Sequence, residues 1–283
     1  NRRLAPDSYL GLGRFTGPAG ETEPVIVMRR HPDDRRLATL VRRGTDVTGE
    51  LEAVASVLAS FHSAADRGPQ IDDEARTGAV AARWQENIAE LRRYATGLVP
   101  GLDGPVVDEI GVLATQFSTG RPELFAARIA DGRILDGHAD LLADDIFCLP
   151  AGPELLDCLE FDDRLRYVDA VDDAAFLAMD LEYLGRPDLA AFFLDRYLNL
   201  TGDDAPPSLQ HFYIAYRAVV RAKVDCVRYT QGHPASVSQA ARHLGIALEH
   251  LRHGTVRLVV VGGAPGTGKS TLARALAGPL DAT

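Results

Sequence analysis

Acidic side chains are spaced through residues 134–160 in a way that suits phosphoryl transfer. Asp140 lies five residues before Asp145, and an apolar segment, Ile146–Leu149, follows directly. Beyond a Pro/Gly turn, Glu160 ends a second apolar segment. One carboxylate can accept the proton of an attacking hydroxyl while the others hold Mg²⁺ against nucleotide phosphates, so this spacing predicts a phosphotransferase site. An acidic surface loop before a hairpin is the alternative interpretation.

A phosphate-binding motif lies near the end of the sequence. An apolar β-branched segment, Val256–Val261, is followed by GGAPGTGKST and then by an Ala/Leu-rich helix predicted over Leu272–Ala277. This is G-x-x-x-x-G-K-[ST] in the strand–loop–helix order that the motif requires, and a Gly-rich turn is the alternative. Lys269 would reach the terminal phosphates, and Ser270 would bind Mg²⁺. The candidate nucleotide-binding residues are Gly263, Gly266, Gly268, Lys269, Ser270 and Thr271.

Composition and charge limit the classes of function. With 283 residues, 46% apolar and 25% charged, the chain has the composition of an ordinary globular protein and room for two domains, or for one and a fragment. A net charge of −10 argues against a nucleic-acid partner. Three cysteines without metal-type spacing indicate a reduced compartment. We find no signal peptide or apolar run of membrane length, so we expect a cytoplasmic protein without a membrane partner.

The two ends of the sequence indicate a piece of a longer protein. The first residue is Asn1 rather than Met, and the last residues fall just past the phosphate-binding loop. Such a loop needs a whole domain behind it. We therefore expect the chain to be cut at both ends.

Hydrophobic periodicity predicts a small sheet followed by a mostly helical body. Two strands, Tyr9–Phe15 and Pro24–Arg30, flank a Gly/Pro turn, and continuous apolar character in Val25–Met28 predicts burial of the second. A short helix is expected within His31–Arg43, and Asp66–Gly78 is a polar linker. Three further strands are Arg133–Leu135, Ile146–Leu149 and Glu154–Leu159. The longer helices are Val47–Ala65, Ala79–Tyr94, Val106–Ser118, Asp172–Leu184, Pro187–Leu200, Ser208–Tyr229 and Ser236–His250.

Several polar residues in this body allow a structural as well as a functional interpretation. We expect His62 to be structural and His138 to brace its loop rather than act as a base. Asp172 and Asp173 would cap the helix that follows them. On another helix, Arg217, Arg221 and Lys223 would either hold an anionic substrate or phosphate or pair with acidic loops, and we favour ion pairing.

The segments HADLLADD, LASFH and LLDCLEFDDRLRYVDAVDDAAFLAMDL resemble the aminoglycoside phosphotransferase (kinase-like) family. FYIAYRAVVRAKV and GGAPGTGKST resemble one group, the actinobacterial and proteobacterial proteins that join such a domain to an ATP-binding, or AAA-family ATPase, domain. The resemblance spans essentially the whole chain. It implies an α+β protein-kinase-like fold with a mostly helical large lobe and a partial small lobe, followed by the start of an α/β P-loop NTPase domain.

The resemblance also implies domain boundaries and roles. Residues 1–30 would be small-lobe strands and hinge, 31–253 the helical lobe with the catalytic loop and hairpin, and 254–283 the start of a P-loop kinase or ATPase domain. Asp140 falls on the family's catalytic Asp, and Asp145 falls where the family usually has a metal-binding Asn. The second metal-binding acid is Glu160 or its rival Asp157.

Two departures from the family pattern affect this site. The common H-G-D-L-H is here His138-Ala139-Asp140-Leu141-Leu142, so the second His is lost. Asp in place of Asn at position 145 adds a negative charge beside the metal.

Together these observations predict an ATP- and Mg²⁺-dependent phosphotransferase that acts on a small hydroxyl acceptor such as a sugar or aminoglycoside. The chain as given would bind ATP weakly and turn it over negligibly. The alternative is a nucleotide-binding regulatory module whose kinase-like domain is degenerate.

Overall fold

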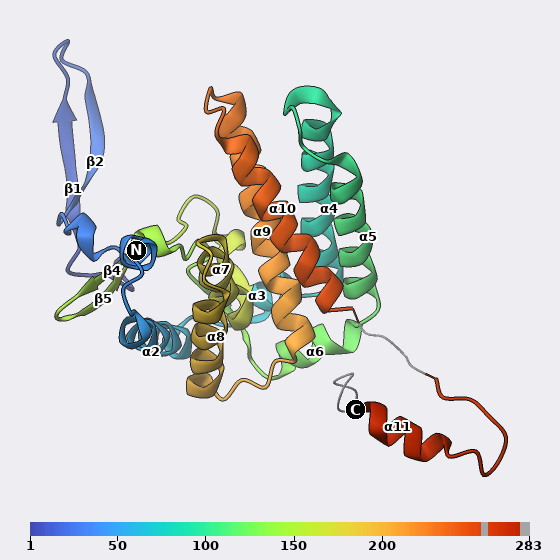
Figure 1. Ribbon diagram of the computed structural model, residues 1–283. Coiled ribbons are helices and arrows are strands. Elements are labelled where there is room, and N and C mark those ends of the chain that lie inside the picture. Colours follow the sequence, from blue (N-terminus) through green and yellow to red (C-terminus); the bar gives the residue numbers. More distant parts are fainter. Residues whose placement is uncertain (256–259, 278–283) are drawn as a thin grey trace.

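Two antiparallel strands near the start of the chain project from a body of long helices (Figure 1). The computed structural model describes residues 1–255 and 260–277. Strands β1 (Tyr9–Thr16) and β2 (Thr22–Met28) pair from Tyr9 opposite Met28 to Thr16 opposite Thr22, as predicted to within two residues. The predicted burial of Val25–Met28 is wrong, because these side chains are 38–56% exposed on a hairpin that points away from the body.

Helix α7 (Ala170–Tyr183) lies at the centre of the helical body, and eleven of its fourteen residues are buried. A helix that is apolar on all sides is stable only when other elements surround it. Around it lie α2 (Thr48–Ala64), α8 (Pro187–Thr201), α9 (Pro207–Thr230) and α10 (Ser236–His253), with α4 (Thr77–Arg93) and α5 (Gly104–Thr119) side by side against α9 and α10 (Figure 1). The predicted long helices are thus confirmed to within three residues at each end.

Short elements connect these helices. The segment expected to be one short helix is a 3₁₀ turn and α1, and the predicted polar linker contains α3. Helix α6 and strand β6 were not predicted from the sequence. These elements are η1 (Asp33–Arg35), α1 (Leu37–Arg42), α3 (Pro69–Asp73), η2 (Tyr94–Leu98), α6 (Pro122–Ala130), η3 (Ala143–Asp145), η4 (Asp163–Arg166) and β6 (Tyr167–Asp169).

Two small sheets frame the loop that carries Asp140. Strand β3 (Ile134–Asp136) pairs antiparallel with β6, and β4 (Ile146–Leu149) pairs antiparallel with β5 (Gly152–Leu155). The prediction of β4 is confirmed, but the second hairpin strand ends at Leu155 rather than Leu159. Asp157 has a left-handed backbone, with a φ of 63°. Because that conformation cannot continue a strand, the strand could not extend to Leu159.

The phosphate-binding motif is described in part. Helix α11 (Lys269–Ala277) begins three residues before the predicted helix, directly after Gly268. The predicted strand Val256–Val261 falls largely outside the described residues. Among the helices that the structure describes, none has the length and apolar character needed to cross a bilayer. The three cysteines are unbridged and buried.

Candidate phosphotransferase site

A buried carboxylate on α7 holds the backbone of the loop that follows β3. Asp173 accepts hydrogen bonds from the backbone N–H groups of His138 and Ala139, both at 2.7 Å. Ala139 has a φ of 68°, a conformation that is costly for a residue with a Cβ and that this pair of bonds stabilises. Gly137 permits the approach, because a Cβ there would lie 2.5 Å from an Asp173 oxygen. The carboxylate therefore fixes the backbone that presents Asp140.

Asp173 is in turn held by His62, the histidine near the end of α2. The Nε2–H of His62 donates to Asp173 at 2.9 Å, and its Nδ1 is 2.6 Å from the hydroxyl of Tyr197. Burial alone would raise the pKa of Asp173, but the bonds from His62 and from the loop hold that pKa well below its usual value. The expected structural role of His62 agrees with this geometry. The prediction that Asp172 and Asp173 cap α7 is wrong, because the Asp169 side chain caps it by accepting the Val171 N–H.

His138 ties the loop that carries Asp140, the candidate catalytic loop, to the segment after the hairpin. Its Nε2 lies 3.0 Å from the carbonyl oxygen of Leu156, and its Nδ1 accepts the Asp140 N–H at 3.3 Å. Both contacts are made by the neutral ring with the proton on Nε2, and burial lowers the pKa of His138. A second tie is the bond from the Leu156 N–H to the Asp145 carbonyl, at 3.0 Å. This geometry agrees with the loop-bracing role expected for His138.

The loop and the hairpin place three carboxylates near one another. Burial, together with the negative charges of Asp157 and Asp140, raises the pKa of Asp145 to about 7. Glu160 is not among the charges that act most strongly on Asp145, and its side chain is exposed. Of these two acids, Asp157 therefore interacts more strongly with Asp145. Within residues 1–255 and 260–277, no cluster of three or more acidic, histidine or cysteine side chains is itself arranged around a metal position.

The raised pKa of Asp145 predicts a pH-dependent cost in stability. Between about pH 4 and pH 7 the unfolded chain has lost the Asp145 proton while the folded chain still holds it, so folding becomes less favourable as pH rises through this window. We expect Asp145→Asn to stabilise the metal-free, full-length protein at pH 8 by on the order of 2 kcal/mol, after discounting for partial exposure, and to stabilise it by less than half as much at pH 5, near the lower end of this window. Thermal unfolding followed by circular dichroism at the two pH values measures this. If Asp145→Asn changed the stability equally at the two pH values, the pKa of Asp145 would not be raised by burial and by its acidic neighbours.

Two arginines on α9 face the catalytic loop with different partners. Arg217 is buried and forms a two-point ion pair with Asp172, at 2.7 and 2.9 Å, and it also donates to the carbonyl oxygen of Ala139 at 3.3 Å. Arg221 lies one turn further along and, among the described residues, has no ion pair within 4 Å. Burial raises the pKa of Asp140, and the charges of Arg221 and Arg217 oppose that rise. Ion pairing, the interpretation favoured from the sequence, thus holds for Arg217 and not for Arg221.

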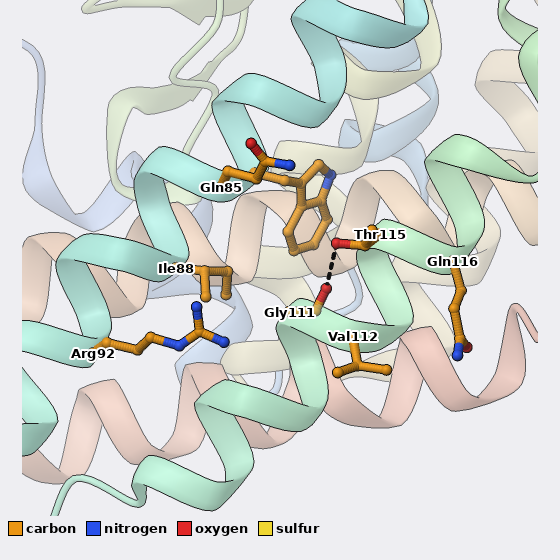
Figure 2. A pocket seen from close by; sticks show the side chains of 8 residues that line it. Gln85, Ile88, Arg92, Gly111, Val112, Thr115 and Gln116 are labelled. Carbon is orange, nitrogen blue, oxygen red and sulfur yellow. Dashed lines mark hydrogen bonds between the residues drawn. The ribbon is translucent and has the colours of Figure 1, made fainter.

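A cavity of about 380 Å³ opens beside Asp140. Its walls come from α4, α7, α9, the catalytic loop and the segment around η4, and Asp140, Arg217 and Arg221 all line it. Because its lining comes from helices and loops distant in sequence, no local pattern could have revealed it. A second cavity, of about 400 Å³, lies between α4 and α5 and has no residue of the catalytic loop in its lining (Figure 2).

The phosphate-binding motif forms an exposed loop before α11. Gly266 and Gly268 have φ values of 81° and 79°, which only glycine adopts without strain. Lys269 folds back over the loop, and its Nζ donates to the carbonyl oxygen of Ala264 at 2.6 Å. Ser270 and Thr271 occupy the first turn of the helix, as the motif requires.

Sequence comparison finds relatives whose function is not described by their names. No family model matches the chain. It is 58% identical over 278 residues to uncharacterized proteins from Mycobacterium bovis and Mycobacterium tuberculosis, covering 98% of this chain and 55% of theirs. The chain thus spans about half the length of these curated relatives.

Among solved structures the chain matches a glucosamine kinase in two crystal forms. In form B the TM-score is 0.54 at 16% identity, over 88% of this chain and 68% of the kinase. In form A the TM-score is 0.50 at 17% identity, over 80% and 58% respectively. The chain has this kinase-like fold. The predicted fold is thereby confirmed at that level, while the domain boundaries, the P-loop NTPase domain and the aminoglycoside phosphotransferase resemblance stay predictions.

Proposed function

We propose that this chain carries the catalytic lobe of an ATP-dependent phosphotransferase acting on a hydroxyl group of a small acceptor such as a sugar. The observation that carries the proposal is the position of Asp140, on a braced loop between the 380 Å³ cavity and the carboxylates of Asp145 and Asp157. The fold shared with glucosamine kinase supports it.

In this proposal the acceptor occupies the cavity with its hydroxyl toward Asp140. Asp140 takes the hydroxyl proton as the acceptor oxygen bonds to the γ-phosphorus, and the bond from that phosphorus to the bridging oxygen breaks, so that ADP leaves with the electron pair. Arg221 and Arg217 favour the ionised form of Asp140, which a base requires. His138 and Asp173 act by positioning, because both hold the loop in place and neither side chain lines the cavity.

The crowded carboxylates fit a divalent cation. The negative charge of Asp157 adds to the cost of ionising Asp145, and a cation between the two carboxylates would relieve that cost. Mg²⁺ takes one or two protein carboxylates and completes its shell with phosphate oxygens and water, so two acids suffice. When bound, the metal neutralises charge on the transferred phosphoryl group. Asp157 is our preferred second ligand, and Glu160 is the weaker candidate.

The choice between Asp157 and Glu160 gives a direct test. We expect Asp157→Asn in the full-length protein to raise the Mg²⁺ concentration for half-maximal transfer roughly 10- to 100-fold, as loss of a group supporting a metal does. Glu160→Gln, the matched control, should change it less than about twofold, because an exposed carboxylate outside the coordination shell contributes little. If Glu160→Gln raised the required Mg²⁺ concentration more than Asp157→Asn did, Glu160 rather than Asp157 would be the second metal ligand.

We also propose that Gly263, Gly266, Gly268, Lys269, Ser270 and Thr271 bind a second nucleotide, with Ser270 on its Mg²⁺. The left-handed glycines and the start of α11 at Lys269 support this. The rival function, a regulatory module with a degenerate kinase-like domain, is favoured by Asp145 in place of the family's Asn. It predicts nucleotide binding without transfer to any acceptor.

A further inference from the structure

The lining of the cavity beside Asp140 is more basic than acidic. Five basic side chains line it, and three acidic ones, of which Asp140 is the expected base. Such an excess is informative only if the basic groups are available to a ligand.

Four of the five basic groups already have acidic partners. Arg217 pairs with Asp172, and Arg83 pairs with Glu74 at 3.0 Å. Lys223 lies 3.7 Å from Glu90, and the exposed Arg164 lies 3.4 Å from Asp162. Each of these four groups therefore already has a carboxylate within 4 Å before any ligand arrives.

Arg221 differs from the other four. It lines the cavity with Asp140, it is half-buried on α9, and among the described residues no carboxylate lies within 4 Å of it. Arg217, one turn before it on α9, is committed to Asp172 and to the loop carbonyl of Ala139, so Arg221 is the cavity-lining cation without an ion pair among the described residues. A guanidinium in a partly desolvated cavity gains most from a carboxylate or phosphate bound at two points.

We propose that the acceptor is an anionic hydroxyl compound, a sugar acid or sugar phosphate, whose carboxylate or phosphate binds Arg221 while its hydroxyl faces Asp140. This proposal rests on the phosphotransferase function proposed above and specifies its substrate class. It also disfavours aminoglycosides and amino sugars, because an ammonium group in this cavity would face the positive charge of Arg221, which has no ion pair within 4 Å among the described residues.

Binding without ATP tests the anion site independently of catalysis. Isothermal titration of the full-length protein with D-glucuronate and with D-glucose 1-phosphate should show binding of at least one of them, with D-glucose binding at least tenfold more weakly. Arg221→Gln should weaken the anion's affinity roughly 10- to 100-fold, as loss of a charge-assisted contact does. Lys223→Gln is the matched control on the same helix and cavity, and should change affinity less than about threefold because Lys223 already faces Glu90. Failure of both anions to bind, or equal binding to the Arg221→Gln variant, would overturn the proposal.

Transfer assays separate this inference from the function on which it rests. With Mg-ATP, the bound anion should be phosphorylated with a higher kcat/KM than glucose or glucosamine, and Arg221→Gln should raise the KM for the anion and leave the KM for ATP within about twofold. Preferred transfer to glucosamine or glucose would overturn the anionic acceptor and leave the kinase intact. An Arg221→Gln effect on the KM for ATP alone would place this arginine on the nucleotide and also overturn it.

Discussion

Asp140→Asn is expected to lower phosphoryl transfer by the full-length protein roughly 10²–10⁴-fold, the usual cost of removing a positioned base. The loop should stay in place, because it is held by the backbone bonds to Asp173 and by the His138 ring rather than by the Asp140 carboxylate. Steady-state transfer of labelled phosphate, with circular dichroism to confirm folding, measures the effect.

The matched control for Asp140 is Asp144, four residues on in the same loop. Its side chain is half-exposed and pairs with Arg42 at the surface, so Asp144→Asn should keep transfer within about threefold. Near-normal turnover by a folded Asp140→Asn protein would exclude Asp140 as the base, whatever the control shows.

Asp173→Ala is expected to destabilise the protein by about 3–5 kcal/mol. The substitution leaves the buried N–H groups of His138 and Ala139 without an acceptor, and it removes the partner of the buried His62. Urea unfolding of the variant and of wild type gives the difference in the free energy of unfolding.

Asp188→Ala is the control for Asp173, because Asp188 is an exposed acid that pairs with Arg186 at the surface. Its loss should cost within about 0.5 kcal/mol. If the Asp173 variant were as stable as the Asp188 variant, the carboxylate on α7 would not be what holds the catalytic loop.

The sequence predicted the local elements around Asp140 better than the contacts that hold its loop. Strand β4 is a local pattern, and it is found where it was expected. Asp173 looked like a helix cap because it follows Asp172 near a helix start, whereas its partners lie 34 and 35 residues earlier in the chain. Local sequence carries no signal for such a contact.

Other errors have similarly physical causes. Helix α6 has nine residues, which gives little periodicity to detect, and its place is fixed by a buried ion pair of Arg128 with Asp169 and Asp203. The apolar run at Val25–Met28 was expected to be buried, yet burial depends on what packs over a strand rather than on the strand itself. Asp157 and Glu160 could not be separated by spacing, because both follow the same apolar segment and lie three residues apart.

In the proposed function, the kinase-like site, rather than the phosphate-binding loop before α11, transfers the phosphoryl group to the acceptor. The most direct measurement follows labelled γ-phosphate from ATP into acceptor in the full-length Lys269→Ala protein, with and without Asp140→Asn. We expect transfer to persist when Lys269 is replaced and to be lost when Asp140 is replaced as well. Transfer that disappears with Lys269 alone, and survives Asp140→Asn in the otherwise wild-type protein, would contradict the proposed function.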